Sequence, residues 1–167
     1  MSSMLTEMSD HRPTPAILFV CLGNICRSPM AEAALRRRLD ASGLEWSVDS
    51  AGTAGYHVGS PPDPRTQRVA AAHGADAAAL QARQVQLSDF DRFTHIFAMD
   101  GGNLADLNAL SPASPNATIE LLLDWVPGRE GQAVADPYYG DLSDFERVWR
   151  EVDEAAAMIV KRLSGNR

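Results

Sequence analysis

A continuous apolar run from Ala16 to Val20, followed by a short loop and a helix start, constrains the fold of this 167-residue chain most strongly. Apolar runs without polar alternation are typical of strands that are covered on both faces of a parallel sheet. After a six-residue loop, Ser28 and Pro29 are expected to provide a helix N-cap and a first-turn proline, and Gly43 to end that helix. The segment therefore predicts a strand–loop–helix unit of an α/β fold.

Strand-like and helix-like segments alternate along the rest of the chain. Strands are expected at residues 46–50, 95–99 and 119–123, and helices at residues 65–73, 102–110 and 143–163. This alternation indicates a parallel sheet with right-handed crossovers. We predict an α/β fold with three layers, a four-stranded parallel sheet flanked by helices, of flavodoxin-like or Rossmann-like type. Residues 15–167 are expected to form a single domain, and residues 1–14 a flexible N-terminal tail.

Composition and charge argue against several classes of protein. The net charge is −7, whereas a nucleic-acid-binding protein usually carries a basic face, so the charge argues against a nucleic-acid-binding protein. The longest apolar run, residues 16–22, is too short to span a bilayer, and the N-terminus has no signal-peptide pattern, so we expect a cytoplasmic protein. The two cysteines and four scattered histidines lack the compact spacing of metal ligands. We expect no metal and no other cofactor.

The residues between the first strand and its helix, CLGNICRS from Cys21 to Ser28, have the chemistry of an oxyanion site. Backbone N–H groups of such a loop can turn inward around an anion, and the helix N-terminus adds donors and partial positive charge. Arg27 can hold two oxygens at once through its guanidinium fork. Cys21 is expected to be an ionised nucleophile, because helix N-termini and nearby arginines favour the thiolate. Gly23 and Asn24 suit the positive φ angles that such a loop needs.

Two separated motifs resemble those of the low-molecular-weight protein tyrosine phosphatases. Residues 20–29 (VCLGNICRSP) are similar to the phosphate-binding loop of that family, and residues 136–140 (DPYYG) resemble its acid loop. Shorter matches occur between them, in the family's order, at residues 49–53, 59–63, 82–84 and 99–100. The resemblance extends over about residues 15 to 163.

This resemblance implies a metal-independent hydrolase that dephosphorylates phosphotyrosine through a phosphocysteine intermediate. Cys21 would attack phosphorus, Arg27 would stabilise the equatorial oxygens, and Asp136 would protonate the leaving phenolate and then activate water. The phosphate-binding loop would comprise Leu22, Gly23, Asn24, Ile25, Cys26 and Ser28.

Supporting roles are also implied. Asn24, Ser28 and Ser50 would form a hydrogen-bond network that holds the loop open. Many relatives add a histidine where this chain has Leu80, which puts one support of Asn24 in doubt. The candidates for walls around a flat phenyl ring are Tyr56, Tyr138 and Tyr139, with ordinary aromatic packing as the alternative for each.

Cys26 has two readings. As a redox partner it would capture an oxidised Cys21 in a disulfide, whereas a small buried apolar side chain is the usual role of a free cysteine. The expected partners are phosphotyrosine-containing proteins, including a bacterial tyrosine kinase, with no nucleic acid and no membrane. We expect the enzyme to be a monomer.

Three alternatives compete with the phosphotyrosine assignment. Related arsenate reductases need further downstream cysteines, and the chain has none after Cys26. Phosphoarginine phosphatases typically carry threonine at the position of Ile25, so the branched apolar side chain favours phosphotyrosine. A phosphate-binding module without catalysis is disfavoured by the intact set of Cys21, Arg27 and Asp136. The phosphoarginine and non-catalytic readings stay open as alternatives.

Overall fold

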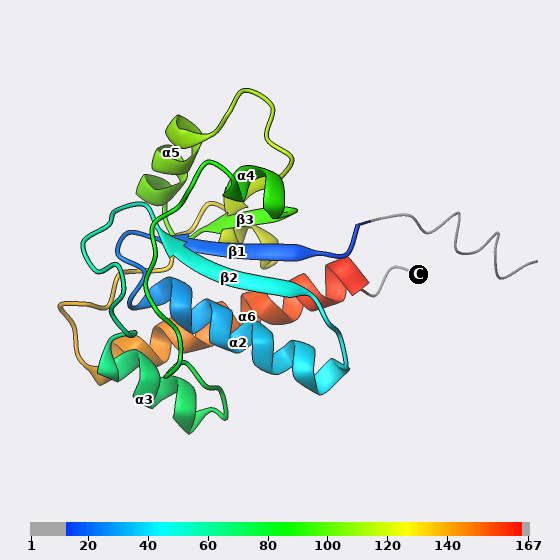
Figure 1. Ribbon diagram of the computed structural model, residues 1–167. Coiled ribbons are helices and arrows are strands. Elements are labelled where there is room, and N and C mark those ends of the chain that lie inside the picture. The colour runs from blue at the N-terminus through cyan, green and yellow to red at the C-terminus, as the bar shows by residue number, and fades with distance from the viewer. Residues whose placement is uncertain (1–12, 165–167) are drawn as a thin grey trace, which may run out of the picture.

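A four-stranded parallel sheet organises the computed structural model, which describes residues 13–164 (Figure 1). Residues 1–12 of the expected N-terminal tail lie outside the described residues. The strand order is β2-β1-β3-β4. The strands are β1 (Ala16–Cys21), β2 (Ser47–Gly52), β3 (His95–Ala98) and β4 (Thr118–Leu121). The apolar run therefore lies in the sheet interior, with β2 on one side and β3 on the other.

Helices cover both faces of this sheet, giving three layers (Figure 1). One face carries α2 (Arg27–Ser42), α3 (Pro64–Ala72) and α6 (Leu142–Ser164). The other carries α4 (Asp89–Arg92) and α5 (Gly101–Leu110), and a 3₁₀ turn, η1 (Leu122–Trp125), follows β4. The predicted fold class is confirmed. No helix within residues 13–164 combines the length and the apolarity needed to cross a bilayer.

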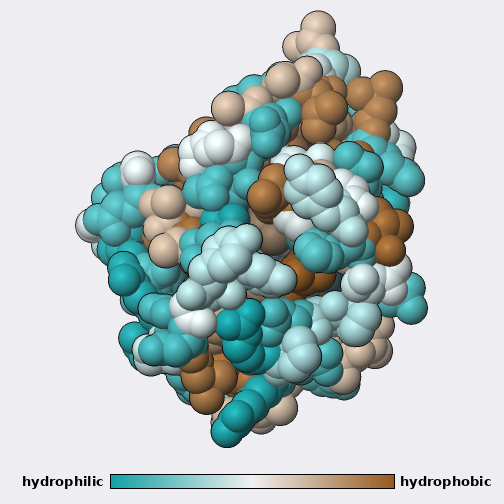
Figure 2. All heavy atoms as spheres, turned by 90° about the vertical axis from the view of Figure 1, so that its left-hand side faces the viewer, coloured by the Kyte–Doolittle hydropathy of each residue, from teal (hydrophilic) through white to brown (hydrophobic). Residues whose placement is uncertain are grey.

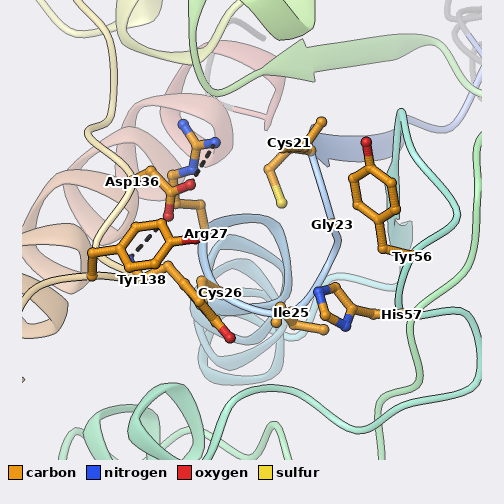
Figure 3. Close-up of a pocket in the computed structure, with 11 residues that line it drawn as sticks. Cys21, Gly23, Ile25, Cys26, Arg27, Tyr56, His57, Asp136 and Tyr138 are labelled. Carbon is orange, nitrogen blue, oxygen red and sulfur yellow. Dashed lines mark hydrogen bonds and ion pairs between the residues drawn. The ribbon is translucent and has the colours of Figure 1, made fainter.

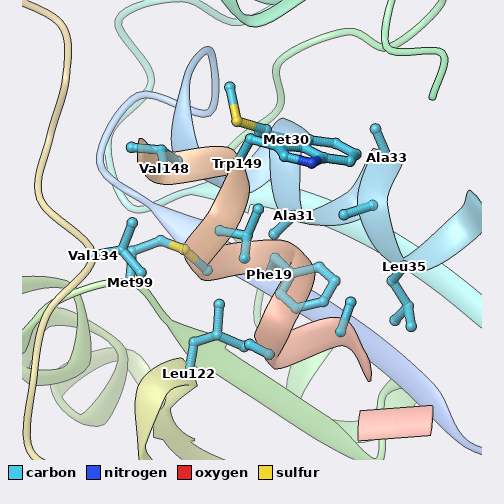
Figure 4. Close-up of a cluster of buried hydrophobic side chains, with 14 of the residues drawn as sticks. Phe19, Met30, Ala31, Ala33, Leu35, Met99, Leu122, Val134, Val148 and Trp149 are labelled. Carbon is cyan, nitrogen blue, oxygen red and sulfur yellow. The ribbon is translucent and has the colours of Figure 1, made fainter. Parts of the chain in front are cut away.

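Alternate side chains of β1 enter two separate cores. Phe19 is buried with Met30 of α2 and Trp149 of α6 in the larger cluster (Figure 4). Leu18 points the other way and is buried in a second cluster with Phe90 and others. Full burial of one such side chain contributes about 1.5–3 kcal/mol. The two clusters fix β1 in the middle of the molecule, and the loop that follows β1 is fixed with it.

One local expectation was wrong, and one short helix was missed. Helix α2 begins at Arg27 with Cys26 as its N-cap, so Ser28 lies inside the first turn and is not the cap. Its hydroxyl instead contacts the sulfur of Cys21. The short helix α4 was missed, because its four residues, Asp89–Arg92, are too few for a helical period to be visible in the sequence.

Candidate active site

The loop from Cys21 to Arg27 lies at the carboxyl end of β1, where parallel sheets place their ligand sites. Asn24 has a φ of 58° and is the only non-glycine residue with positive φ among the described residues. The expectation of positive φ is thus confirmed for Asn24. It is wrong for Gly23, which has a different constraint: a Cβ there would be 3.0 Å from the His57 ring.

The sulfur of Cys21 is surrounded by hydrogen-bond partners from this loop. Ser28 Oγ lies 2.9 Å from Sγ, and the backbone N–H of Asn24 donates to Sγ over 3.3 Å. Hydrogen bonds to an ionised acceptor are stronger than those between neutral groups. Both groups therefore lie where they can donate to a Cys21 thiolate.

The side-chain amide of Asn24 is hydrogen-bonded through both of its N–H groups and through its oxygen. Nδ2 donates to Ser28 Oγ at 2.8 Å and to Ser50 Oγ at 3.0 Å, while Oδ1 accepts from the backbone N–H of Arg83 at 3.0 Å. Leu80 offers no side-chain donor, but the amide of Arg83 binds the oxygen of Asn24. Both N–H groups and the oxygen of the Asn24 amide therefore have partners without a histidine at position 80.

The network extends from Ser50 to a buried carboxylate on α2. Ser50 Oγ donates to Glu32 Oε1 at 2.8 Å, and Glu32 also pairs with Arg36 one turn later. Burial raises the pKa of Glu32, while the contacts with Ser50 and Arg36 oppose that rise. Sequence reasoning missed Glu32, although an acidic residue among the apolar positions of a helix is a signal that could have identified it.

The guanidinium of Arg27 is buried and held by groups from distant parts of the chain. Nη1 donates to Oδ2 of Asp100, a residue that follows β3, at 2.7 Å, and to the carbonyl of Val134 at 2.9 Å. Nη2 lies 3.9 Å from Asp136 Oδ2. Asp100 fixes the orientation of Arg27, a role that sequence reasoning did not assign. The sequence feature that could have identified Asp100 is its position at the carboxyl end of a strand.

These groups surround a pocket of about 280 Å³ (Figure 3). Figure 2 looks onto this side of the molecule, where the surface is hollowed near its centre. The lining residues are Cys21, Leu22, Gly23, Ile25, Cys26, Arg27, Tyr56, His57, Asp136, Tyr138 and Tyr139. Asn24, Ser28 and Ser50 lie behind the pocket as buried supports. His57 was not anticipated; it lies in the Gly- and Pro-rich loop after β2.

The three tyrosines on the pocket rim are exposed to solvent. Tyr56 is 76% exposed, Tyr138 is 40% exposed and Tyr139 is 96% exposed. Side chains that are this exposed are not packed in the hydrophobic core. Tyr56 and Tyr138 face each other across the pocket in Figure 3, so a flat ring could enter between them.

Both cysteines are buried free thiols. Burial, followed by the negative charges of Asp63, Cys21 and Asp136, raises the pKa of Cys26 to about 12, so it is a neutral thiol at physiological pH. Among residues 13–164, no group of three or more His, Cys, Asp or Glu side chains is arranged to hold a metal ion. The chemistry available in the pocket is that of a nucleophilic sulfur, an anion cradle and a carboxyl group.

Comparison with known proteins gives a consistent result. A family model described as low molecular weight phosphotyrosine protein phosphatase matches residues 16–167. The Schizosaccharomyces pombe low molecular weight phosphotyrosine protein phosphatase is 45% identical over 151 residues, which is 89% of this chain and 96% of that protein.

Solved structures agree with this match. A protein tyrosine phosphatase from Entamoeba histolytica with Hepes in its active site superposes with a TM-score of 0.84 at 36% identity, covering 92% of this chain and all of that one. The Drosophila arginine phosphatase superposes with a TM-score of 0.85 at 32% identity, covering 91% of this chain and 99% of that one.

Proposed function

The chain belongs to the low molecular weight phosphotyrosine protein phosphatase family, and from that premise we propose that Cys21, Arg27 and Asp136 perform its hydrolysis of phosphotyrosine. The observation that supports this assignment most is that all three side chains line one pocket around the β1–α2 loop. Each brings a different chemical capacity to the same point.

In the first step, the Cys21 thiolate attacks phosphorus, and the bond between phosphorus and the phenolic oxygen breaks. Asp136, as the carboxylic acid, gives its proton to the departing phenolate. Arg27 and the loop amides bind the phosphoryl oxygens, on which negative charge is concentrated. The backbone N–H of Asn24 donates to the sulfur, and the Ser28 hydroxyl is placed to donate to the thiolate before attack.

In the second step, water hydrolyses the phosphocysteine. Asp136, now a carboxylate, takes a proton from the attacking water, the bond between sulfur and phosphorus breaks, and the Cys21 thiolate is regenerated. Inorganic phosphate leaves the cradle. This cycle uses only groups of the chain and water.

We propose phosphotyrosine as the substrate because the pocket rim is aromatic and one of the lining residues is Ile25. The exposed rings of Tyr56 and Tyr138 would pack against a phenyl group on its way to the loop. Phosphoarginine is the alternative substrate, and the structural match to the Drosophila arginine phosphatase is the observation that favours it. Phosphotyrosine-containing proteins, a bacterial tyrosine kinase among them, are the proposed partners of a monomeric cytoplasmic enzyme.

We also propose that Cys26 is a redox partner of Cys21. Peroxide would convert the Cys21 thiolate to a sulfenic acid, and Cys26 would displace its hydroxyl as water to form a disulfide. Both sulfurs border the same pocket, which supports such a reaction. The raised pKa of Cys26 makes its attack slower than that of an ordinary thiol.

Substitutions of Cys21 and Asp136 test the assignment. Cys21→Ser should abolish turnover of phosphotyrosine peptides while inorganic phosphate still binds, because the cradle keeps its donors. Asp136→Asn should lower kcat/KM on phenyl phosphate by about 10²–10⁴-fold. Assays in the presence of a chelator should give unchanged rates. Full activity of either variant would contradict the proposed mechanism.

A further inference from the structure

We propose that Arg65, paired with Asp63, is a positioning residue that holds the loop carrying Asp136 at a fixed place over the phosphate-binding loop. Asp63 is the N-cap of α3, and Arg65 lies in the first turn of that helix. The proposal rests on the proposed function of Asp136 as the general acid. It concerns a residue that does not line the pocket.

The guanidinium of Arg65 binds the acid loop at two backbone positions. Nη2 donates to the carbonyl of Tyr138 at 3.0 Å, and Nη1 donates to the carbonyl of Gly140 at 3.1 Å. The same group lies 4.3 Å from the ring centre of Phe145 and 5.7 Å from that of Tyr138, within range of cation–π attraction. Arg65 thus holds the chain on the C-terminal side of Asp136.

A second set of contacts ties α3 to the phosphate-binding loop. The backbone N–H of Asp63 donates to the carbonyl of Ile25 at 2.8 Å, and Thr66 Oγ1 contacts the carbonyl of Cys26 at 3.4 Å. The Asp63 carboxylate receives Arg65 Nε at 3.0 Å and Nη2 at 2.9 Å. Arg65 lowers the pKa of Asp63, so that carboxylate stays ionised and the pair persists at acidic pH.

The first turn of α3 therefore bridges the two loops whose spacing determines whether Asp136 reaches the leaving oxygen. Only arginine has enough fixed donors to bind one carboxylate and two carbonyls together; the lysine ammonium has three donors on a flexible stem. Within the acid loop itself, Asp136 Oδ1 accepts a hydrogen bond from the Tyr138 N–H at 3.1 Å. A shift of the Tyr138 backbone would therefore also move the Asp136 carboxyl group.

A leaving-group test separates this role from a general structural one. Phenyl phosphate depends on protonation by Asp136 more than p-nitrophenyl phosphate does, because phenolate is the more basic leaving group. Arg65→Gln should lower kcat/KM on phenyl phosphate by about 10²-fold, the loss typical of a misplaced catalytic group. The loss on p-nitrophenyl phosphate should be clearly smaller, and inhibition by inorganic phosphate should be unchanged.

The decisive measurement is a double-mutant cycle with Asp136→Asn. If Arg65 acts through Asp136, Arg65→Gln should cause no further loss once Asp136 has been replaced. An equal loss in both backgrounds would overturn the proposal and leave the acid assignment intact. A fully active Asp136→Asn would refute the proposed function, and the positioning role with it.

Two further variants serve as controls. Arg68→Gln changes an exposed arginine of the same helix and should leave kcat/KM unchanged on both substrates. Arg65→Lys retains the positive charge without the fork, and should fold normally yet show the same leaving-group-dependent loss. Failure of both Arg65 variants to fold would assign the residue to stability and overturn the proposal.

Discussion

Replacement of Asn24 by alanine should destabilise the protein by about 4 kcal/mol. The variant loses three hydrogen bonds, those to Ser28, Ser50 and the Arg83 amide, each contributing about 1 kcal/mol to the free energy of unfolding. Alanine at a φ of 58° adds about 1 kcal/mol of backbone strain, because it lacks the short polar side chain that lets asparagine tolerate that conformation.

Urea unfolding followed by tryptophan fluorescence measures this loss, since Trp125 and Trp149 are buried. The buffer should be free of phosphate, because a ligand bound only to the native state would raise the apparent stability. Asn24→Gly removes the same hydrogen bonds without the strain, so it should lose less than Asn24→Ala. A loss below about 1 kcal/mol for Asn24→Ala would refute the reasoning, since even one net hydrogen bond contributes that much.

The remaining predictions concern selectivity, redox chemistry and pH. Ile25→Thr should raise the activity on phosphoarginine relative to phosphotyrosine, and wild-type preference for phosphoarginine would overturn the assignment of Ile25. After peroxide treatment, dithiothreitol should restore the wild type but not Cys26→Ala; equal recovery would leave Cys26 a packing residue. The raised pKa of Glu32 means that its contribution to stability is present below about pH 4.5 and is lost as the pH rises through the folded-state pKa. As the pH rises through the folded-state pKa of Glu32, the free energy of unfolding of the wild type should therefore fall relative to that of Glu32→Gln. Urea unfolding at a series of pH values measures this difference, and a difference independent of pH would contradict the prediction.

The sequence predicted the fold well wherever a segment carried one unambiguous signal. The unbroken apolar run of β1 could only be a strand buried on both faces, and the Gly43 stop ended α2 as expected. Boundaries were less certain, because a serine followed by a proline predicts an N-cap at Ser28, while the observed N-cap is Cys26, two residues earlier. The free hydroxyl of Ser28 then contacts the nucleophile, which local propensity cannot anticipate.

The site divides in the same way. Cys21 and Arg27 could be proposed from their spacing in one loop between a strand and a helix, whereas Asp136 could be proposed only through the family resemblance. Supports that act through the backbone could not be proposed, since the Arg83 amide that binds Asn24 could belong to any residue type. Arg65 meets the site only through tertiary contacts that no local pattern encodes, and the one local signal for Asp100 was its position at the carboxyl end of a strand.

The contact of Arg27 with Asp100 and Val134 has a consequence for the choice of inhibitors. One edge of the guanidinium is already occupied by the protein, so its rotamer is fixed before any ligand arrives. Ordering a free arginine side chain costs about 2 kcal/mol of entropy, and a ligand of this pocket avoids that cost. The Nη2 side of the guanidinium, 3.9 Å from Asp136 Oδ2, can still donate to the oxygens of a ligand. A neutral aromatic compound would fit between the tyrosines but offer these donors no strong acceptor, so potency should require an anionic head group that binds them.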